Sequence, residues 1–220
     1  MVCMKLSFTS KNAPPPEPPK PDVLLVSQSI GRKMLLEKLG IRFRVAVARI
    51  NEEAITDADP FKMLKRRAEA KAHEVSAHPR VYNLMEDRET LVIAADSMAI
   101  VGKKSYGKAD DREHTKVMLK ALMGKPHVFA TAIVIQLLEN GGVKKTWAKT
   151  IKTRVTMRKM NTTEVESYVL RYDFTRFAAG YAVNEAPWDL ITKIDGSYTN
   201  VIGLPFEVLL PILRTLKIIV

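Results

Sequence analysis

The stretch "LVIAADSMAIV", from Leu91 to Val101, constrains the fold of this chain more than any other. It is apolar nearly throughout and its apolar residues do not alternate with polar ones, which predicts a strand buried on both faces of a sheet. Asp96 stands in the middle of this strand. Because burying an unpaired carboxylate is costly, either a cation meets Asp96 or the strand reaches the surface there. The sequence leaves both open.

A proline-rich segment precedes the globular part of the chain. Residues 1–21 end in "APPPEPPKP", where six prolines fall between positions 14 and 21, so we expect a disordered tail. The remaining residues, 22–220, are long enough for one domain or two small lobes. The hydrophobic fraction of 46% supports a packed core.

Hydrophobic periodicity predicts the elements of the globular part. We expect strands at 23–26, 41–47, 91–101, 127–138, 143–157 and about 190–194, and helices at 29–39, 59–75, 110–124, 163–170 and the C-terminus. Asp59 and Pro60 begin the second helix. A capping-box pattern of Thr163 with Glu166 begins the fourth, and Pro211 should kink or interrupt the last. Strands alternate with helices before a hairpin, which predicts an α/β fold with a mixed sheet flanked by helices.

Composition narrows the classes of function. No apolar run reaches the roughly 18 residues that span a bilayer, and no secretory signal is recognisable, so we expect a cytoplasmic protein without membrane association. Cys3 is the only cysteine, which rules out an internal disulfide. The net charge of +11 favours anionic partners: nucleic acid, an acidic membrane face or phosphorylated small molecules. Scattered basic residues and 7% aromatic residues disfavour single-strand nucleic-acid binding.

The segment "LLVSQSIGR" is the first candidate site. It passes from a strand through Ser27 and Ser29 into a helix start that carries Arg32. Free backbone N–H groups beside hydroxyls and a guanidinium suit a phosphate. The plainer alternative is that Ser29 only caps the helix and Arg32 lies on the surface.

Two lysines are further candidates. Lys71 falls on the apolar face of the helix at 59–75, where an anion would compensate its charge; the alternative is that its ammonium extends to water. Lys108 follows a glycine just before a helix, and a loop lysine is usually solvated. The basic segments 62–67 and 144–158 are expected to be solvated surface, with contact to a polyanion as the alternative.

Several familiar sites are not expected. The four histidines have no spacing suited to a metal pair and no cysteine nearby, so zinc is not expected. The chain contains neither a "GxxxxGK[ST]" phosphate loop nor a "GxSxG" nucleophile motif.

A series of short motifs resembles the Maf-like family of nucleoside triphosphate pyrophosphatases, the septum-formation-inhibitor proteins. In order they are "SQSIGR", "LLEKLG", "INEE", "AEAKA", "IAADSM", "YGKADD", "MLKALMGKPHVFATAI", "AGYAVNE" and "IDGSYTNVIGLP". No piece is specific alone, but their order and spacing are. The resemblance implies an elongated α/β fold similar to that of the inosine triphosphate pyrophosphatases. Residues 22–220 would then form a single domain with two lobes around a cleft, and the protein would be a homodimer.

The resemblance also implies a reaction, which is hydrolysis of a nucleoside triphosphate to a monophosphate and pyrophosphate with Mg²⁺ or Mn²⁺, as in house-cleaning of nucleotide pools. Glu52 and Asp96 would hold the cation, and Asp96 would be the general base on the attacking water. The expected catalytic residues are Asp96, Glu52, Lys108 and Lys71, and the expected substrate-binding residues are Ser27, Ser29, Arg32 and Asn184.

The chain departs from the family pattern at positions that face the base or sugar. "SIGR" stands where "SPRR" is usual, and Ala109 replaces a proline after Lys108. Arg176 and Phe177 replace an aspartate and a lysine, and Asn184 replaces a glutamine. The metal and lysine positions are kept, so the chemistry is better supported than the substrate.

The substrate expected from the resemblance is a pyrimidine nucleotide. In "DSM" and "DGSYTNVIGLP" the chain is similar to the branch associated with dTTP, UTP and modified pyrimidine triphosphates, whereas the other branch prefers 7-methyl-GTP. One alternative is a pyrophosphatase of damaged purine triphosphates. Another is a catalytically impaired member that acts as a division regulator or a nucleic-acid-binding module.

Overall fold

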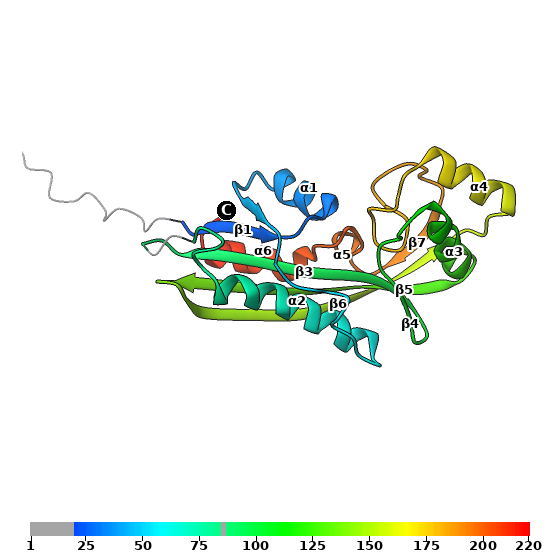
Figure 1. Ribbon diagram of the computed structural model, residues 1–220. Coiled ribbons are helices and arrows are strands. Elements are labelled where there is room, and N and C mark those ends of the chain that lie inside the picture. Colours follow the sequence, from blue (N-terminus) through cyan, green and yellow to red (C-terminus); the bar gives the residue numbers. More distant parts are fainter. Residues whose placement is uncertain (1–19, 85–86) are drawn as a thin grey trace, which may run out of the picture.

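The computed structural model describes residues 20–84 and 87–220 (Figure 1). The predicted disordered tail at 1–21 therefore lies almost entirely outside the described residues, as does Cys3. The elements are β1 (Asp22–Val26), α1 (Ile30–Lys38), β2 (Arg44–Ala46), α2 (Pro60–Ala77), β3 (Thr90–Val101), β4 (Lys104–Tyr106), α3 (Arg112–Leu122), β5 (Pro126–Glu139), β6 (Gly142–Met157), α4 (Thr162–Arg171), β7 (Ile191–Asp195), α5 (Tyr198–Ile202) and α6 (Phe206–Thr215). Within these ranges no helix is long and apolar enough to cross a membrane.

A seven-stranded mixed sheet is the frame of the molecule. Its order is β2-β1-β3-β5-β6-β7, with β4 paired to the end of β3. β1 runs parallel to both β2 and β3, whereas the later pairs, including the β5–β6 hairpin, are antiparallel. Figure 1 shows β3, β5 and β6 extending along most of the elongated molecule. The predicted mixed sheet flanked by helices is confirmed.

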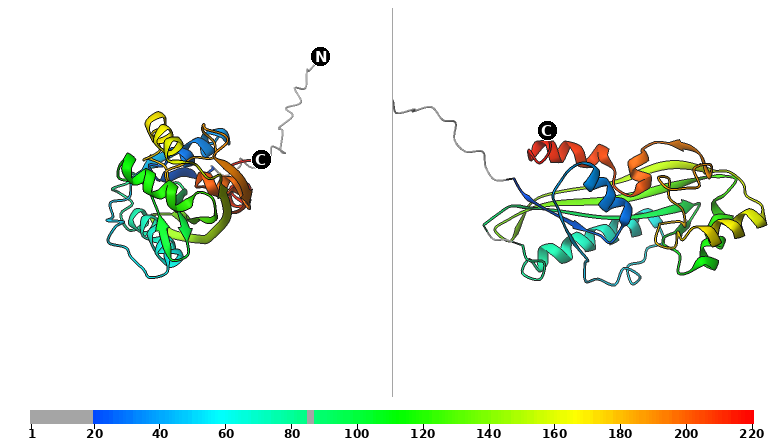
Figure 2. Two further views of the ribbon diagram at one scale, coloured as in Figure 1. Left: turned by 90° about the vertical axis from the view of Figure 1, so that its right-hand side faces the viewer. Right: turned by 90° about the horizontal axis from the view of Figure 1, so that it is seen from above.

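Helices cover both faces of the sheet at one end of the molecule. Leu24 and Val26 of β1 pack into a cluster with α2, whereas Val23 and Leu25 pack into a cluster with α1 and α6 on the opposite face. A third cluster joins α3, α4 and β7 at the other end (Figures 1 and 2). A strand with helices on both faces is apolar without alternation, which explains the sequence of β3. The division into two lobes stays a prediction.

Three local predictions need correction. The capping box of α4 is Asn161 with Glu164, because Asn161 has the extended backbone of a cap and Thr163 is already helical. Pro211 does not interrupt α6, which continues to Thr215 with its apolar face packed on the sheet, while a kink at Pro211 stays a prediction. The strand expected at 41–47 is limited to Arg44–Ala46. The cap of α2 by Asp59 is confirmed, since its carboxylate accepts the N–H of Phe61 at 2.9 Å.

Candidate active site

Asp96 lies where β3 loses one of its neighbours. β1 ends at Val26, which pairs with Ala94, and β4 pairs with β3 only from Ala99, so β5 is the only strand beside β3 at Asp96. The carboxyl ends of parallel strands are a common place for ligands because a crevice opens there. Ala95 is fully buried, but the Asp96 side chain is 15% exposed. The strand thus approaches the surface at Asp96.

A cation also meets Asp96. Lys71 reaches from the inner face of α2, and its ammonium lies 3.0 Å from Asp96 Oδ1 and 2.6 Å from Glu52 Oε2. The Lys71 side chain is only 9% exposed, so the alternative that it extends to water is wrong. Both possibilities raised by the sequence for Asp96 therefore hold together. Glu52 comes from the loop before α2 and is 44% exposed.

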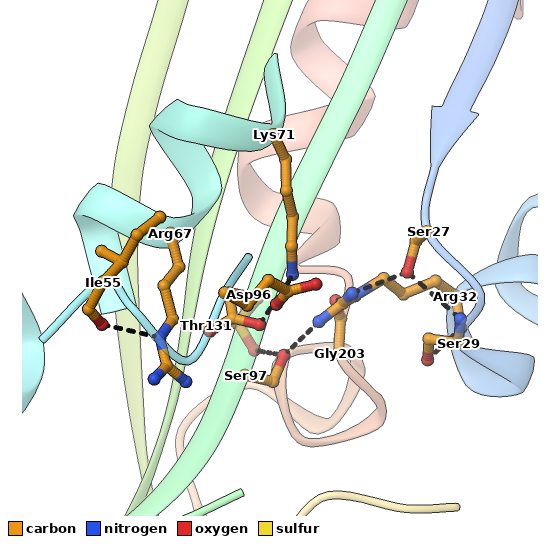
Figure 3. A network of polar contacts seen from close by, with 11 residues as sticks. Ser27, Ser29, Arg32, Ile55, Arg67, Lys71, Asp96, Ser97, Thr131 and Gly203 are labelled. Atoms are coloured by element: carbon orange, nitrogen blue, oxygen red, sulfur yellow. Dashed lines mark hydrogen bonds and ion pairs between the residues drawn. The ribbon is translucent and has the colours of Figure 1, made fainter. Parts of the chain in front are cut away.

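Arg32 joins three elements of the site (Figure 3). Its guanidinium donates to the Gly203 carbonyl at 2.7 Å, to Ser27 Oγ at 2.8 Å and to Ser97 Oγ at 2.8 Å. Arg32 is buried, so the alternative of a surface arginine is wrong. Burial lowers the pKa of its guanidinium, against the smaller raising effects of Asp96 and Glu52.

The partners of Arg32 are themselves fixed. Ser97 Oγ lies 2.8 Å from Thr131 Oγ1, which donates to the Asn200 carbonyl at 3.0 Å. Gly203 ends α5 with φ of 112°, a backbone conformation that side chains disfavour. A Cβ at that position would stand 3.4 Å from Arg32 Nε. The carbonyl that anchors Arg32 therefore depends on a glycine.

Ser29 is the helix cap that its plainer interpretation predicted. Its hydroxyl accepts the N–H of Arg32 at 3.5 Å, and it begins α1 with an extended backbone. The hydroxyl of Ser27 accepts both from Arg32 and from the N–H of Ser29. Although Ser29 caps the helix, both Ser27 and Ser29 belong to the candidate site, because both line the cleft described next.

One cleft of about 590 Å³ brings the whole predicted set together. All eight predicted residues line it: Ser27, Ser29, Arg32, Glu52, Lys71, Asp96, Lys108 and Asn184. Lys108 is exposed and pairs through its backbone with Ala178, while Ala179 N–H donates to the Gly107 carbonyl at 2.6 Å. Asn184 Nδ2 lies 3.6 Å from Met34 Sδ. Lys108 and Asn184 line the cleft without contacting the two carboxylates.

Sequence reasoning missed Arg67, Ser97 and Thr131. Arg67 lines the cleft, so the prediction that the whole basic segment 62–67 is solvated surface is wrong for this residue. Its position four residues before Lys71 on a helix was the signal available in the sequence. The roles of Ser97 and Thr131 carry no such signal, because their partners lie 65 and 69 residues away along the chain.

Glu52 and Asp96 are the residues that fit a divalent cation. The described ranges contain no group of three or more His, Cys, Asp or Glu side chains that could hold a metal. Magnesium is commonly held by one or two carboxylates, with water and substrate phosphates as the other ligands. Two carboxylates that share one ammonium in a cleft match that donor set, so the residues present fit Mg²⁺ or Mn²⁺.

Comparison with known proteins agrees with the motifs. The family model described as "Maf-like protein" matches residues 22–216. A dTTP/UTP pyrophosphatase of Citrifermentans bemidjiense is 33% identical over 194 residues, covering 88% of this chain and 95% of that protein. A protein of Ruegeria named nucleoside triphosphate pyrophosphatase is 35% identical over 191 residues, covering 83% of this chain and 90% of its own length.

Solved structures give a weaker likeness. A HAM1 protein from Coxiella burnetii aligns at 15% identity and a TM-score of 0.42, covering 90% of this chain and 98% of its own.

Proposed function

Because this chain belongs to the Maf-like protein family, we propose that it is a nucleoside triphosphate pyrophosphatase. The observation that carries the proposal is the pair of carboxylates, Glu52 and Asp96, held by Lys71 in a cleft with further cations. Phosphoryl chemistry requires such cations to stabilise the charge of the triphosphate, and a carboxylate to activate water. The names of the relatives, dTTP/UTP pyrophosphatase and nucleoside triphosphate pyrophosphatase, support the same reaction.

Asp96 is the proposed general base. Its Oδ1 is held by Lys71, and no hydrogen bond from any described residue reaches Oδ2, which is left to accept a proton. The water oxygen bonds to the α-phosphorus and its proton passes to Asp96. The bond from the α-phosphorus to the bridging oxygen breaks, and pyrophosphate leaves with that electron pair. Lys71, Lys108 and the buried Arg32 compensate the charge of the phosphate oxygens.

Metal dependence is part of the proposal. Glu52 and Asp96 would hold the cation, with water and phosphate oxygens completing its ligands. A bound Mg²⁺ or Mn²⁺ would neutralise and polarise the phosphate oxygens.

The proposed substrates are dTTP, UTP or modified pyrimidine triphosphates, and the proposed role is house-cleaning of nucleotide pools. Relatives that carry the name dTTP/UTP pyrophosphatase support this class. Several cleft-lining residues stand where the chain departs from the family pattern: Gly31, Ala109, Arg176, Phe177 and Asn184. Cytoplasmic location and a homodimer stay predictions.

Pyrophosphate release tests the proposal. The purified chain is assayed with canonical and modified nucleoside triphosphates in Mg²⁺, in Mn²⁺ and in excess chelator. We expect a pyrimidine triphosphate to be cleaved only with metal, and Asp96→Asn to lower kcat by at least about 100-fold, since it removes the base. Asp189→Asn, an exposed carboxylate that pairs with Arg158, is the control and should keep full activity. If every triphosphate stays intact under every condition, the proposed pyrophosphatase activity is wrong.

The nucleic-acid-binding alternative predicts a different response to the same variant. Binding that rests on lysines and arginines weakens steeply with added salt and survives Asp96→Asn. Metal-dependent cleavage of the nucleoside triphosphate would be lost in Asp96→Asn. Fluorescence anisotropy with a labelled oligonucleotide, run beside the pyrophosphate assay, separates the two functions.

A further inference from the structure

α2 carries a second cationic side chain into the cleft. Arg67 stands four residues before Lys71, which places the two on the same side of the helix. Both line the cleft, and Figure 3 shows their side chains extending from α2 in the same direction. In that view Asp96 lies between Arg67 and Arg32.

One hydrogen bond fixes the guanidinium of Arg67, and its other N–H groups have no partner among the described residues. Its Nε donates to the Ile55 carbonyl at 3.2 Å, which fixes the direction of the group. The two terminal nitrogens have no hydrogen bond to any described residue, and no described carboxylate lies within 4.0 Å of them. An arginine has five N–H donors, so four remain available for a ligand.

Arg66, the preceding residue of α2, is a surface arginine and serves as a comparison for Arg67. Arg66 is 61% exposed, pairs with Asp57 at 3.4 Å and lies outside the cleft. Arg67 is half-buried and has a carbonyl partner instead of a carboxylate. A half-buried guanidinium that faces a cleft without an acid partner is suited to an anion that enters from solution.

We propose that Arg67 is a further substrate-binding residue, whose terminal N–H groups bind the β- and γ-phosphates of the nucleoside triphosphate. This inference rests on the proposed function. The α-phosphorus must lie near Asp96 for attack by water, and Arg67 lies one helical turn along α2 from the lysine that holds Asp96. A planar guanidinium binds phosphate oxygens in a bidentate manner, which a lysine cannot reproduce.

Calorimetric binding of a non-hydrolysable ligand tests this without turnover. The probes are dTTP with a methylene group between the α- and β-phosphates, and dTMP, each with Mg²⁺. We expect Arg67→Ala to weaken binding of the triphosphate analogue by about 10- to 100-fold, the range of hydrogen bonds to charged groups, and binding of dTMP by less than about twofold. Arg67→Lys should recover only part of the loss. Arg66→Ala is the matched control and should bind as the unsubstituted chain does.

The outcomes separate this inference from the proposed function. If the unsubstituted chain binds no triphosphate analogue, the proposed function fails and the inference with it. If it binds but Arg67→Ala binds equally well, only the role of Arg67 is overturned. Equal losses for the analogue and dTMP would also overturn it, because they would mean that Arg67 only ties α2 to the loop at Ile55.

Discussion

Asp96 shows how a carboxylate is accommodated in an otherwise apolar strand. Its preceding residues on β3 are fully buried, but β1 ends two residues earlier in the register, at the pair Val26–Ala94. The carboxylate therefore faces a cleft and contacts the Lys71 ammonium, which lines the same cleft. The free-energy cost of burying the charge is reduced by both contacts. A carboxylate would destabilise an entirely apolar core, but Asp96 is stabilised at the position where the proposed reaction needs a base.

His127 gives a pH-dependent contribution to stability. It is 2% exposed, its Nε2 lies 2.9 Å from the Tyr181 hydroxyl, and burial lowers its pKa to about 4. In the unfolded chain the pKa is about 6.5, so between these values only the unfolded state binds the proton. We expect this residue to contribute fully above pH 6.5, and to lower the free energy of unfolding by up to about 3 kcal/mol as the pH falls to 4.

Urea unfolding between pH 7 and pH 4 measures this contribution. His127→Gln, whose amide oxygen can accept from Tyr181, should reduce the loss of stability over this range. His73→Gln, at an exposed position of α2, should follow the unsubstituted chain. The same pH profile in His127→Gln and the unsubstituted chain would show that His127 is not the group responsible.

At the scale of elements, α1 is positioned by its close approach to α5. An ideal Cβ at Gly31 would lie 2.7 Å from the Ile202 carbonyl oxygen and 2.9 Å from Ile202 Cγ2. The glycine at this position of "SIGR" therefore permits a packing distance that a side chain would prevent. Because α1 also carries Ser29 and Arg32, its position determines where the guanidinium meets Ser97 and Gly203.

Gly31→Ala should destabilise the protein and impair the site together. Overpacking costs about 1 to 3 kcal/mol, which we expect in the free energy of unfolding. We also expect a lower kcat/KM, because a shift of α1 moves Arg32. Lys33→Ala, on the exposed side of the same helix, should change stability by less than about 0.5 kcal/mol and leave the activity unchanged. Chemical unfolding and the pyrophosphate assay check both; unaltered values for Gly31→Ala would refute the packing argument.

At the scale of the whole molecule, the charge balance favours an anionic substrate. The net charge is +11, and cations in the cleft outnumber its carboxylates: Arg32, Arg67, Lys71, Lys108 and Arg176 against Glu52, Glu53, Asp96 and Asp110. Such a field attracts a triphosphate over distances comparable with the Debye length, about 10 Å at 0.1 M salt. Added salt should therefore weaken the encounter more than the chemical step.

We expect kcat/KM to fall several-fold between 50 and 300 mM KCl, while kcat at saturating substrate changes less. Steady-state kinetics at constant Mg²⁺ check this, with the melting temperature followed over the same series to exclude unfolding. A kcat/KM that is independent of salt would mean that the net charge has no part in substrate capture.

The sequence by itself determined the longer elements and much of the site, but not the short strand β4 or the short helix α5. The unbroken apolar run of β3 predicted a strand covered on both faces, and the stripe that includes Lys71 predicted which side of α2 faces inward. These are local regularities, because the 3.6-residue period of a helix follows from backbone geometry and an unbroken apolar run marks a strand covered on both faces. The motif order also selected eight residues that do line one cleft.

Only the tertiary structure decided which of those residues touch. It placed Lys71 between Glu52 and Asp96, moved the capping box of α4 to Asn161, and showed that Arg32 is held by Ser97 and Gly203. It also separated Arg67, in the cleft, from Arg66, in solvent. Such contacts join residues up to 171 positions apart, and they depend on how helices pack on the sheet, which no local period encodes.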